Sequence, residues 1–396
     1  MFLFQQYDVY LIVGLPLVLV TAPLLIELFA VTLAASMPPR RRSRRLQLPA
    51  LGRLVILVPS HNEELNIGRC VASIAASAGS TDDILVIAHN CEDGTAERAR
   101  ASGAMVSVLE DPRRRGKGSA LAHGFRAAFE DLGADAVLVI DADSTVSTNM
   151  VGCIRERLED ASVLQCRYEC LSVASNPKSR LRALAFFCMN VIRPMGRQRL
   201  NLSCGIFGNG FALRREVIEQ VPYAAHSIVE DVEFHLSLVA AGLRCDFVEE
   251  ARVWAEVPTV ARAAATQSAR WEGGRLRMLR CQGPSILLKA LRGRGALLAP
   301  LLNLAGLPLA METIVLVELL IFPVHFLRVY AVFGIAVIAL HLFFAICLGP
   351  EPFADLRALA QAPFYVVSKI GMLPGIFRMT RARAGWVRTA RTVAPE

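Results

Sequence analysis

The sequence predicts an α/β fold in which helices cover a mostly parallel sheet and transmembrane helices flank it. Between about residues 49 and 294, short apolar runs alternate with helical patterns, a βαβ rhythm that is typical of a parallel sheet. Long apolar runs lie on both sides of this region, and they have the length that a helix needs to cross a bilayer. We therefore expect a membrane segment at 1–48, an α/β domain at 49–294 and a second membrane region at 295–396.

The N-terminal segment is expected to be one transmembrane helix followed by a basic stretch. Its apolar run extends from Tyr7 to Ala35, and about 20 such residues suffice to span a bilayer. Arginines fill most of the segment from Pro39 to Arg45 directly behind it. The positive-inside rule places such a cluster in the cytoplasm, where it can contact anionic lipid headgroups.

The central domain is expected to begin with parallel strands whose carboxyl ends share one edge. Polar segments follow three of these strands, at 59–64, 89–94 and 141–143, and ligands of such sheets bind at that edge. The predicted strands are Leu54–Val58, Ile84–Ala88, Val106–Leu109 and Ala136–Ile140, and the predicted helices between them are Glu64–Ala76, Ala96–Ser102 and Gly118–Leu132.

Two carboxylates close the most apolar of these strands. Asp141 and Asp143 stand one pleat apart after Ala136–Ile140, so their side chains are expected to point the same way. Like charges this close repel each other unless a cation lies between them. A hard divalent ion such as Mg²⁺ or Mn²⁺, shared with a phosphate group, fits this pair. The alternative is a solvated acidic turn.

The C-terminal region is expected to hold two further transmembrane helices, Ala296–Pro323 and Val329–Leu348. The next apolar stretch, Phe353–Phe377, is interrupted by prolines, a glycine and a lysine. It is interpreted as an interfacial segment, because a fourth span would carry the basic tail that begins at Arg378 out of the cytoplasm. This topology places the α/β domain and the C-terminus in the cytoplasm of a multi-pass protein of the inner or plasma membrane.

Charge and cysteine content exclude two classes of function. The formal net charge is +8, but the arginines cluster beside the membrane runs, which disfavours a nucleic-acid partner. None of the ten cysteines forms a Cys-x-x-Cys pair and no histidine cluster accompanies them, so a structural zinc site is not expected.

Four more motifs accompany the two aspartates, and each is weak by itself. Lys117 ends a basic, glycine-rich turn that opens a helix, where it could contact a diphosphate or belong to a solvated charge run. Glu230 and Asp231 precede a predicted helix at 232–240, as an N-cap also would. The other two motifs are Gly208-Asn209-Gly210, a turn that lets a ligand approach the backbone, and Gln267-Ser-Ala-Arg270-Trp271.

Taken together and in this order, the motifs resemble the processive branch of glycosyltransferase family 2, which includes cellulose, hyaluronan and chitin-oligosaccharide synthases. The resemblance covers roughly Leu54 to Arg280 and includes an Asn-Glu-Glu sequence after the first strand. It implies a GT-A fold, which is Rossmann-like, a nucleotide-sugar donor and Mg²⁺ or Mn²⁺ as cofactor.

The resemblance also implies roles for individual residues. Asp143 is the likelier metal ligand of the aspartate pair and Asp231 is the general base that deprotonates the acceptor hydroxyl, which gives inversion at the anomeric carbon. Trp271 offers a stacking face to the acceptor sugar. The remaining implied residues are Glu63, His89, Lys117, Asp141 and Arg270 at the donor, and Gly208, Asn209, Glu230 and Gln267 at the acceptor.

One departure from the family pattern leaves the nucleotide open. His89 stands where the family usually has an aspartate that contacts the base of the nucleotide, and a histidine carries no permanent negative charge. UDP is the first expectation and GDP the second.

The acceptor is also open, between a saccharide and a lipid-linked group. Three spans leave little material for a polymer channel unless the protein forms an oligomer or has an export partner. Glu27, Glu312 and Glu318 lie within the predicted spans, where carboxylates are costly, so they are hypothesised to bind a polar part of the acceptor. The alternative is a protonated carboxyl satisfied within the helix bundle, or a slightly misplaced span edge. The alternative function is a non-catalytic membrane scaffold, which the retained aspartates disfavour.

Overall fold

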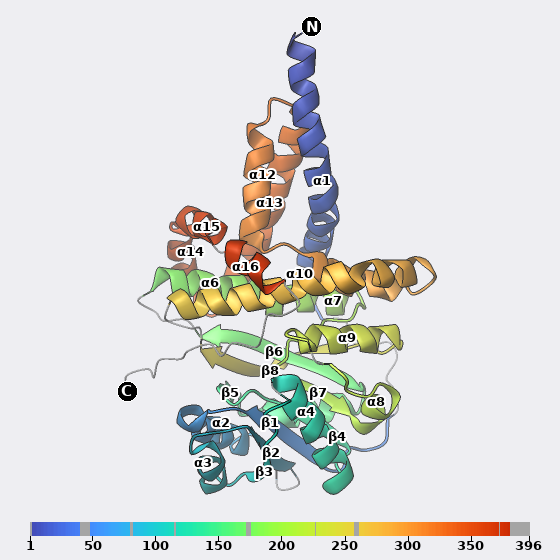
Figure 1. Cartoon of the computed structure of the whole chain (residues 1–396), viewed down its shortest axis with the longest axis vertical. Helices are drawn as coiled ribbons and strands as arrows, with labels where there is room; N and C mark the ends of the chain where they lie inside the picture. Colours follow the sequence, from blue (N-terminus) through green and yellow to red (C-terminus); the bar gives the residue numbers. More distant parts are fainter. Residues whose placement is uncertain are drawn as a thin grey trace.

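The computed structural model describes residues 2–39, 48–79, 82–114, 116–171, 176–225, 227–256, 261–371 and 373–380. Most of the basic stretch up to Arg45 and the arginines after residue 380 lie outside the described residues. In Figure 1 the α/β domain forms the lower part of the molecule and the apolar helices stand above it, with a long helix, α10 (Ala261–Leu291), crossing between the two.

The α/β domain contains an eight-stranded sheet in the order β3-β2-β1-β4-β7-β6-β8-β5. The first four strands in this order pair in parallel, as the βαβ rhythm predicts, whereas β7 pairs antiparallel with both β4 and β6. The sheet is therefore mixed, but the four strands that the sequence predicts, β1 to β4, are parallel to one another. The strands are β1 Leu54–Ser60, β2 Asp82–His89, β3 Met105–Leu109, β4 Ala136–Val139, β5 Ser144–Val146, β6 Val163–Leu171, β7 Phe211–Arg214 and β8 Asp246–Glu256.

Helices cover both faces of this sheet because its central strands are apolar on both sides. Val55 and Leu57 of β1 pack into one buried cluster with residues of the helices at 117–126 and 177–199. Leu54, Ile56 and Val58 pack into a second cluster on the opposite face. The helices are α2 Glu64–Ala75, α3 Thr95–Ala101, α4 Lys117–Arg126, α5 Met150–Leu158, α6 Pro177–Phe187, α7 Arg193–Arg199, α8 Arg215–Gln220 and α9 Glu230–Ala240, with π turns at Ala127–Asp131 and Cys188–Ile192.

Among the residues that the structure describes, two helices are long and apolar enough to cross a membrane: α1 (Phe2–Ala35), over Asp8–Ala35, and α13 (His325–Leu348). They agree with two of the three predicted spans. The third predicted span, Ala296–Pro323, is a bent pair of helices rather than one straight helix, and the two together have the length and composition of one broken span. The chain there forms α11 (Leu298–Ala305) and α12 (Leu309–Ile321), which are bent by 80° at their junction. Pro308 lacks the amide hydrogen that a continuous helix needs at this point.

The region that follows α13 contains three short helices, α14 (Pro352–Leu359), α15 (Ala362–Ile370) and α16 (Leu373–Met379). At 1.5 Å per residue, none of them reaches across the roughly 30 Å of a bilayer core. Figure 1 shows α14 and α15 at the level of α6, and α16 against α10. The interfacial position of this region stays a prediction.

A buried ion-pair cluster joins α1 to the α/β domain. Glu27 of α1 accepts hydrogen bonds from Arg193 (2.5 Å) and Arg197 (2.7 Å), both on α7, and all three residues are buried. Gly196 lies between the two arginines in sequence, and a Cβ there would overlap the backbone of Val31 in α1. The hypothesis that Glu27 binds the acceptor is therefore not supported, because two arginines already satisfy its carboxylate.

Replacing Glu27 with glutamine is expected to lower the free energy of unfolding by about 3–5 kcal/mol, because two buried guanidinium groups lose their counter-charge. The measurement is thermal or denaturant unfolding of the detergent-solubilised protein. Glu318→Gln is the matched control, since Glu318 is exposed on α12 and should change the stability little. Equal midpoints for the two variants would show that the cluster does not hold α1 in place.

Candidate active site

The two predicted metal-binding aspartates lie in a turn after β4 rather than on the strand itself. β4 ends at Val139, and the amide N–H of Ser144 donates to the carbonyl of Asp141 at 3.0 Å. The prediction that the two side chains stand one pleat apart on a strand is therefore wrong, because the chain turns before Asp141. The pair nonetheless sits at the carboxyl edge of the parallel strands, where the polar segments were expected.

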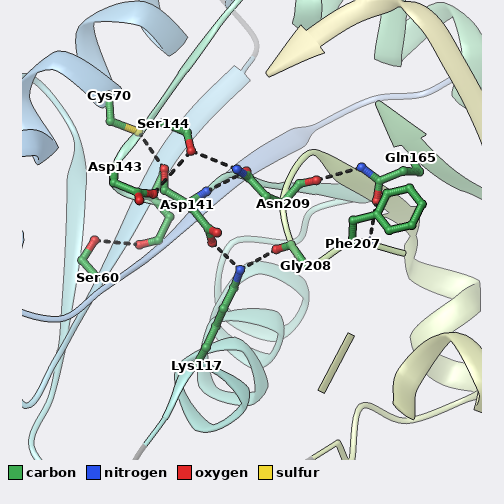
Figure 2. A network of polar contacts seen from close by, with 11 residues as sticks. Ser60, Cys70, Lys117, Asp141, Asp143, Ser144, Gln165, Phe207, Gly208 and Asn209 are labelled. Carbon is green, nitrogen blue, oxygen red and sulfur yellow. Dashed lines mark hydrogen bonds and ion pairs between the residues drawn. The ribbon is translucent and has the colours of Figure 1, made fainter. Parts of the chain in front are cut away.

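The Gly208-Asn209-Gly210 turn packs directly against this aspartate turn. Asn209 is fully buried, its Oδ1 accepts from the amide of Asp141 (3.0 Å) and its Nδ2 donates to Ser144 Oγ (2.9 Å). Both glycines have positive φ, +75° and +69°, a conformation that favours glycine. Figure 2 shows Asn209 linking the two turns. The motif thus fixes the position of Asp141 from the side.

Lys117 reaches into the same place from the first residue of α4. Its Nζ forms an ion pair with Asp141 and also donates to the carbonyl oxygen of Gly208 (Figure 2). The predicted turn that opens a helix is confirmed, since α4 begins at Lys117 after Gly116 with φ +101°. The alternative, a solvated charge run, does not describe Lys117, because its side chain is only 23% exposed and its ammonium contacts Asp141 and Gly208.

Glu230 and Asp231 approach this cluster from a third element, the first turn of α9. The helix begins at Glu230, with Val229 as its N-cap residue, so the predicted start at 232 is wrong and neither carboxylate is an N-cap. A Cβ placed on Gly208 would lie 3.3 Å from Asp231 Oδ2 and 3.6 Å from Lys117 Nζ. A glycine at 208 therefore lets the Asp231 carboxylate and the Lys117 ammonium approach the same point.

Burial and mutual repulsion perturb the protonation of these groups. The pKa of Glu230 is raised to about 7, by burial and by the neighbouring charge of Asp231. Burial also raises the pKa of Asp231. Burial by itself would lower the pKa of Lys117, but the carboxylates of Asp141, Glu230 and Asp231 outweigh it and raise that pKa. A carboxylate that holds its proton up to near neutral pH is suited to proton transfer.

Helix α10 carries Gln267, Arg270 and Trp271 and passes the start of α9. It crosses close to α9, because a Cβ on Gly274 would lie 2.9 Å from Cγ1 of Val229, the residue just before Glu230. Trp271 is 38% exposed. Its ring contacts Phe186 (centroids 6.4 Å apart), and Phe186 packs edge-on against Tyr168 (4.8 Å). This row of rings leads from α10 to the aspartate turn.

Two predicted donor residues lie on the neighbouring strands and have local partners. The carboxylate of Glu63, after β1, accepts from Asn66 Nδ2 at 2.8 Å. His89, at the end of β2, is buried, and its Nε2 lies 3.1 Å from Asn90 Nδ2. Burial lowers the pKa of His89, so its imidazole is neutral near pH 7. The adjacent parallel strands β2, β1 and β4 bring both residues to the edge that holds Asp141.

Three residues of the site were not predicted. Gln165 is buried in β6, where its amide donates to the carbonyl of Asn209 (2.8 Å) and accepts from the amide of Phe207 (3.0 Å). Burial raises the pKa of the Tyr168 hydroxyl, and the nearby Cys170, Asp141 and Asp143 raise it further. The Tyr168 side chain also forms a hydrogen bond with Asn209. Tyr223 packs on Phe234 (4.9 Å) at the start of α9. Only Gln165 had a signal in the sequence, as a polar residue within an apolar run.

A divalent ion would find hard oxygen ligands here, as the sequence predicts, but too few for a complete site. Within the described ranges, no group of three or more histidine, cysteine, aspartate or glutamate side chains converges in a way that could hold a metal ion. Asp141 is already paired with Lys117. The donor set fits an ion such as Mg²⁺ or Mn²⁺ that takes one or two carboxylates and completes its shell with substrate phosphates and water.

Comparison with known proteins places these residues in context. Residues 51–274 match the model of a family described as glycosyltransferase like family 2. No curated protein matches the chain. One similar solved structure is a mannosyltransferase from Pyrobaculum calidifontis in complex with GDP-mannose and Mn²⁺. The similarity covers 93% of this chain and 97% of the mannosyltransferase, with 15% sequence identity and a TM-score of 0.52. This similarity shows a shared GT-A-like fold.

Two further solved structures are similar to a smaller part of the chain. Mannosyl-3-phosphoglycerate synthase from Rubrobacter xylanophilus has 23% identity over 58% of this chain and 75% of its own, with a TM-score of 0.41. Glucosyl-3-phosphoglycerate synthase from Mycobacterium tuberculosis, in complex with Mn²⁺, UDP and phosphoglyceric acid, has 23% identity, and the similarity covers 50% of this chain and 68% of the synthase, with a TM-score of 0.35. Similarities this low bear on neither fold nor function.

Proposed function

Because this chain belongs to glycosyltransferase family 2, we propose that it is a membrane-bound, inverting transferase that moves a sugar from a nucleotide-sugar donor to a saccharide or lipid-linked acceptor. The proposal extends to cell-surface polysaccharide or glycolipid synthesis, with the α/β domain at 49–294 in the cytoplasm and the apolar helices in the inner or plasma membrane. The observation that carries it is the convergence of Lys117, Asp141 and Asp231 around the Gly208 backbone.

The proposed reaction exchanges one bond for another at the anomeric carbon. The acceptor hydroxyl attacks from the side opposite the nucleotide, its oxygen bonds to the anomeric carbon, and the bond to the diphosphate oxygen breaks. Asp231 takes the hydroxyl proton and later releases it to water. The configuration at the anomeric carbon is inverted because a single attack occurs on the face opposite the leaving group. Asp231 lies on α9, a different element from the aspartate turn after β4, so the base and the donor-binding carboxylates come from separate parts of the chain.

The chain's own residues divide between the two substrates in this proposal. Asp141, held by Lys117 and Asn209, orients the donor together with Glu63, His89 and Arg270 at the sheet edge. Trp271, Gln267 and Glu230 face the acceptor, and Gly208 with Asn209 forms the surface between them. Asp143, with Asp141 beside it, would hold Mg²⁺ or Mn²⁺, and the ion when bound neutralises charge on the leaving diphosphate.

The donor and the acceptor are to be found by experiment. Purified full-length protein with Mn²⁺ or Mg²⁺ is offered UDP- and GDP-sugars, each with soluble saccharides or with membrane lipids as acceptor, and release of nucleotide is measured. UDP-sugars come first. GDP-sugars come second, because His89 replaces the usual aspartate and because the similar Pyrobaculum structure contains GDP-mannose. Failure of every nucleotide sugar with every acceptor would contradict the proposal.

The transfer rate is expected to rise with pH through an apparent pKa near 7. The Glu230–Asp231 pair keeps a proton below that pH, and a protonated carboxyl cannot accept the proton of the acceptor. The apparent value belongs to the pair rather than to one residue. Glu230→Gln removes the carboxyl whose pKa is about 7, so the rise near that pH is expected to disappear from its profile. The measurement is kcat/KM against pH for both proteins at saturating metal, and coincident profiles would contradict the coupling.

A further inference from the structure

A small cavity lies where α1, α7 and the junction of α11 with α12 meet, away from the candidate active site. It has about 10 Å³ of space that the centre of a water molecule can reach, enough for about one small group. Figure 1 shows two of these elements, α1 standing upright and α7 near its lower end. The cavity is lined by Leu24, Leu28, Arg193, Gly306, Leu307, Leu309 and Glu312.

Two side-chain polar atoms of residues that line this cavity lack a hydrogen-bond partner. They are Nε of Arg193 and Oε1 of Glu312, and neither has such a partner among the described residues. The two residues are 7% and 3% exposed. The rest of the Arg193 guanidinium is engaged, with Nη2 donating to Glu27 (2.5 Å) and Nη1 to Met189 Sδ (3.3 Å). A buried donor and a buried acceptor that remain unsatisfied cost stability, so they point to a ligand that satisfies both.

The charges around the cavity select a neutral ligand. Arg193 and Arg197 bring two positive charges, and Glu27 and Glu312 bring two carboxylates. Both arginines already share Glu27. An anion would be repelled by Glu312, and a cation would meet the free edge of Arg193. A hydroxyl group carries no charge, accepts one hydrogen bond and donates another, and so complements the pair Nε–H and Oε1.

The remaining walls indicate what carries the hydroxyl. Leu24 and Leu28 come from α1, and Leu307 and Leu309 from the bend before α12, so four leucines surround the two polar groups. We propose that this cavity binds the hydroxyl group of a neutral membrane lipid, which accepts from Nε of Arg193 and donates to Oε1 of Glu312, while its apolar part, too large for this space, stays outside the cavity.

A lipid bound here has a structural route to α10. Arg275, one turn after Trp271, donates from Nη2 to the carbonyl of Gly306 at 2.8 Å, and Gly306 lines the cavity. The bend that closes the cavity and the helix that carries Arg270 and Trp271 are therefore joined by a hydrogen bond. Occupancy is expected to stabilise the bend and, with it, the placement of α10.

The test compares two neutral lipids that differ in one hydroxyl. Dioctanoylglycerol and trioctanoylglycerol are added to the purified full-length protein in detergent, and the unfolding midpoint is measured. Dioctanoylglycerol is expected to raise the midpoint by at least about 2 °C, and trioctanoylglycerol is not. Glu312→Leu should abolish the difference, Glu312→Gln should retain part of it because the amide oxygen still accepts, and Glu318→Leu, exposed on the same helix, should leave it unchanged.

Two results would overturn the proposal. An equal effect of the two lipids would mean that their apolar part, and not the hydroxyl, is what binds. No effect of either lipid would mean that a trapped water molecule satisfies Arg193 and Glu312. The wild-type comparison decides between these outcomes even if Glu312→Leu fails to fold, and because it measures stability, it is independent of whether the chain transfers sugar.

Discussion

Asp231→Asn is expected to lower kcat by about 100- to 10,000-fold, the range over which a positioned general base accelerates a reaction. Asparagine has nearly the same shape but cannot accept the acceptor proton. Donor binding should persist, because the contacts of Asp141 with Lys117 and Asn209 do not involve Asp231. The measurements are single-turnover transfer and nucleotide affinity for the same preparation, so that loss of chemistry is separated from loss of binding.

Glu233→Gln is the matched control for this experiment. Glu233 lies on the same helix two residues further on, and its carboxylate accepts from the amide of Ser227 at 3.0 Å, outside the cluster around Lys117. It should transfer at close to the wild-type rate. If Asp231→Asn keeps more than about a tenth of the activity while Glu230→Gln loses it, the base is Glu230 and the role of Asp231 is to raise its pKa.

The position of the site was predictable because it depends on local patterns. Apolar runs such as Leu54–Val58 and Ala136–Ile140 are typical of strands buried on both faces of a parallel sheet, and parallel strands bring their carboxyl ends to one edge. From that geometry alone, the segments after β1, β2 and β4 had to meet. Their order along the chain was sufficient to predict where Glu63, His89 and Asp141 lie.

The contacts within the site were not predictable in the same way. The ion pair of Lys117 with Asp141 and the packing of Asn209 on Asp141 join elements 24 and 68 residues apart. They depend on β7 entering the sheet antiparallel beside β4, a pairing that no local pattern specifies. Gln165 is a further case, since a buried amide within β6 is an anomaly whose partner only the fold supplies.

The membrane region shows a similar division. Apolar length predicted α1 and α13, because hydrophobicity alone decides whether a helix can enter a bilayer. It did not predict the bend between α11 and α12, because apolar composition does not distinguish a straight helix from two bent ones. The Gly306–Pro308 sequence was the available signal. The partners of Glu27 could not be foreseen, since Arg193 and Arg197 lie 166 and 170 residues away.

Asp143→Asn is expected to have the second large effect, on the dependence of transfer on Mg²⁺ or Mn²⁺. Removing a ligand from an ion that stabilises the leaving group costs several kcal/mol of transition-state stabilisation, and each 1.4 kcal/mol is a tenfold change in rate. We expect kcat/KM to fall by at least about 100-fold, and the metal concentration for half-maximal rate to rise. The measurement is a titration of EDTA-treated protein with Mn²⁺ and with Mg²⁺ at fixed donor.

Asp141→Asn should differ in kind, because this carboxylate is the partner of Lys117. Its loss leaves the partly exposed Lys117 ammonium with fewer counter-charges, so protein stability and donor KM are expected to change more than the metal titration does. Asp131→Asn, exposed on the π turn after α4, is the control for charge alone. If Asp143→Asn titrates with metal as the wild type does while Asp141→Asn does not, the ion is held by Asp141, and Lys117 must move away from that carboxylate when the metal binds.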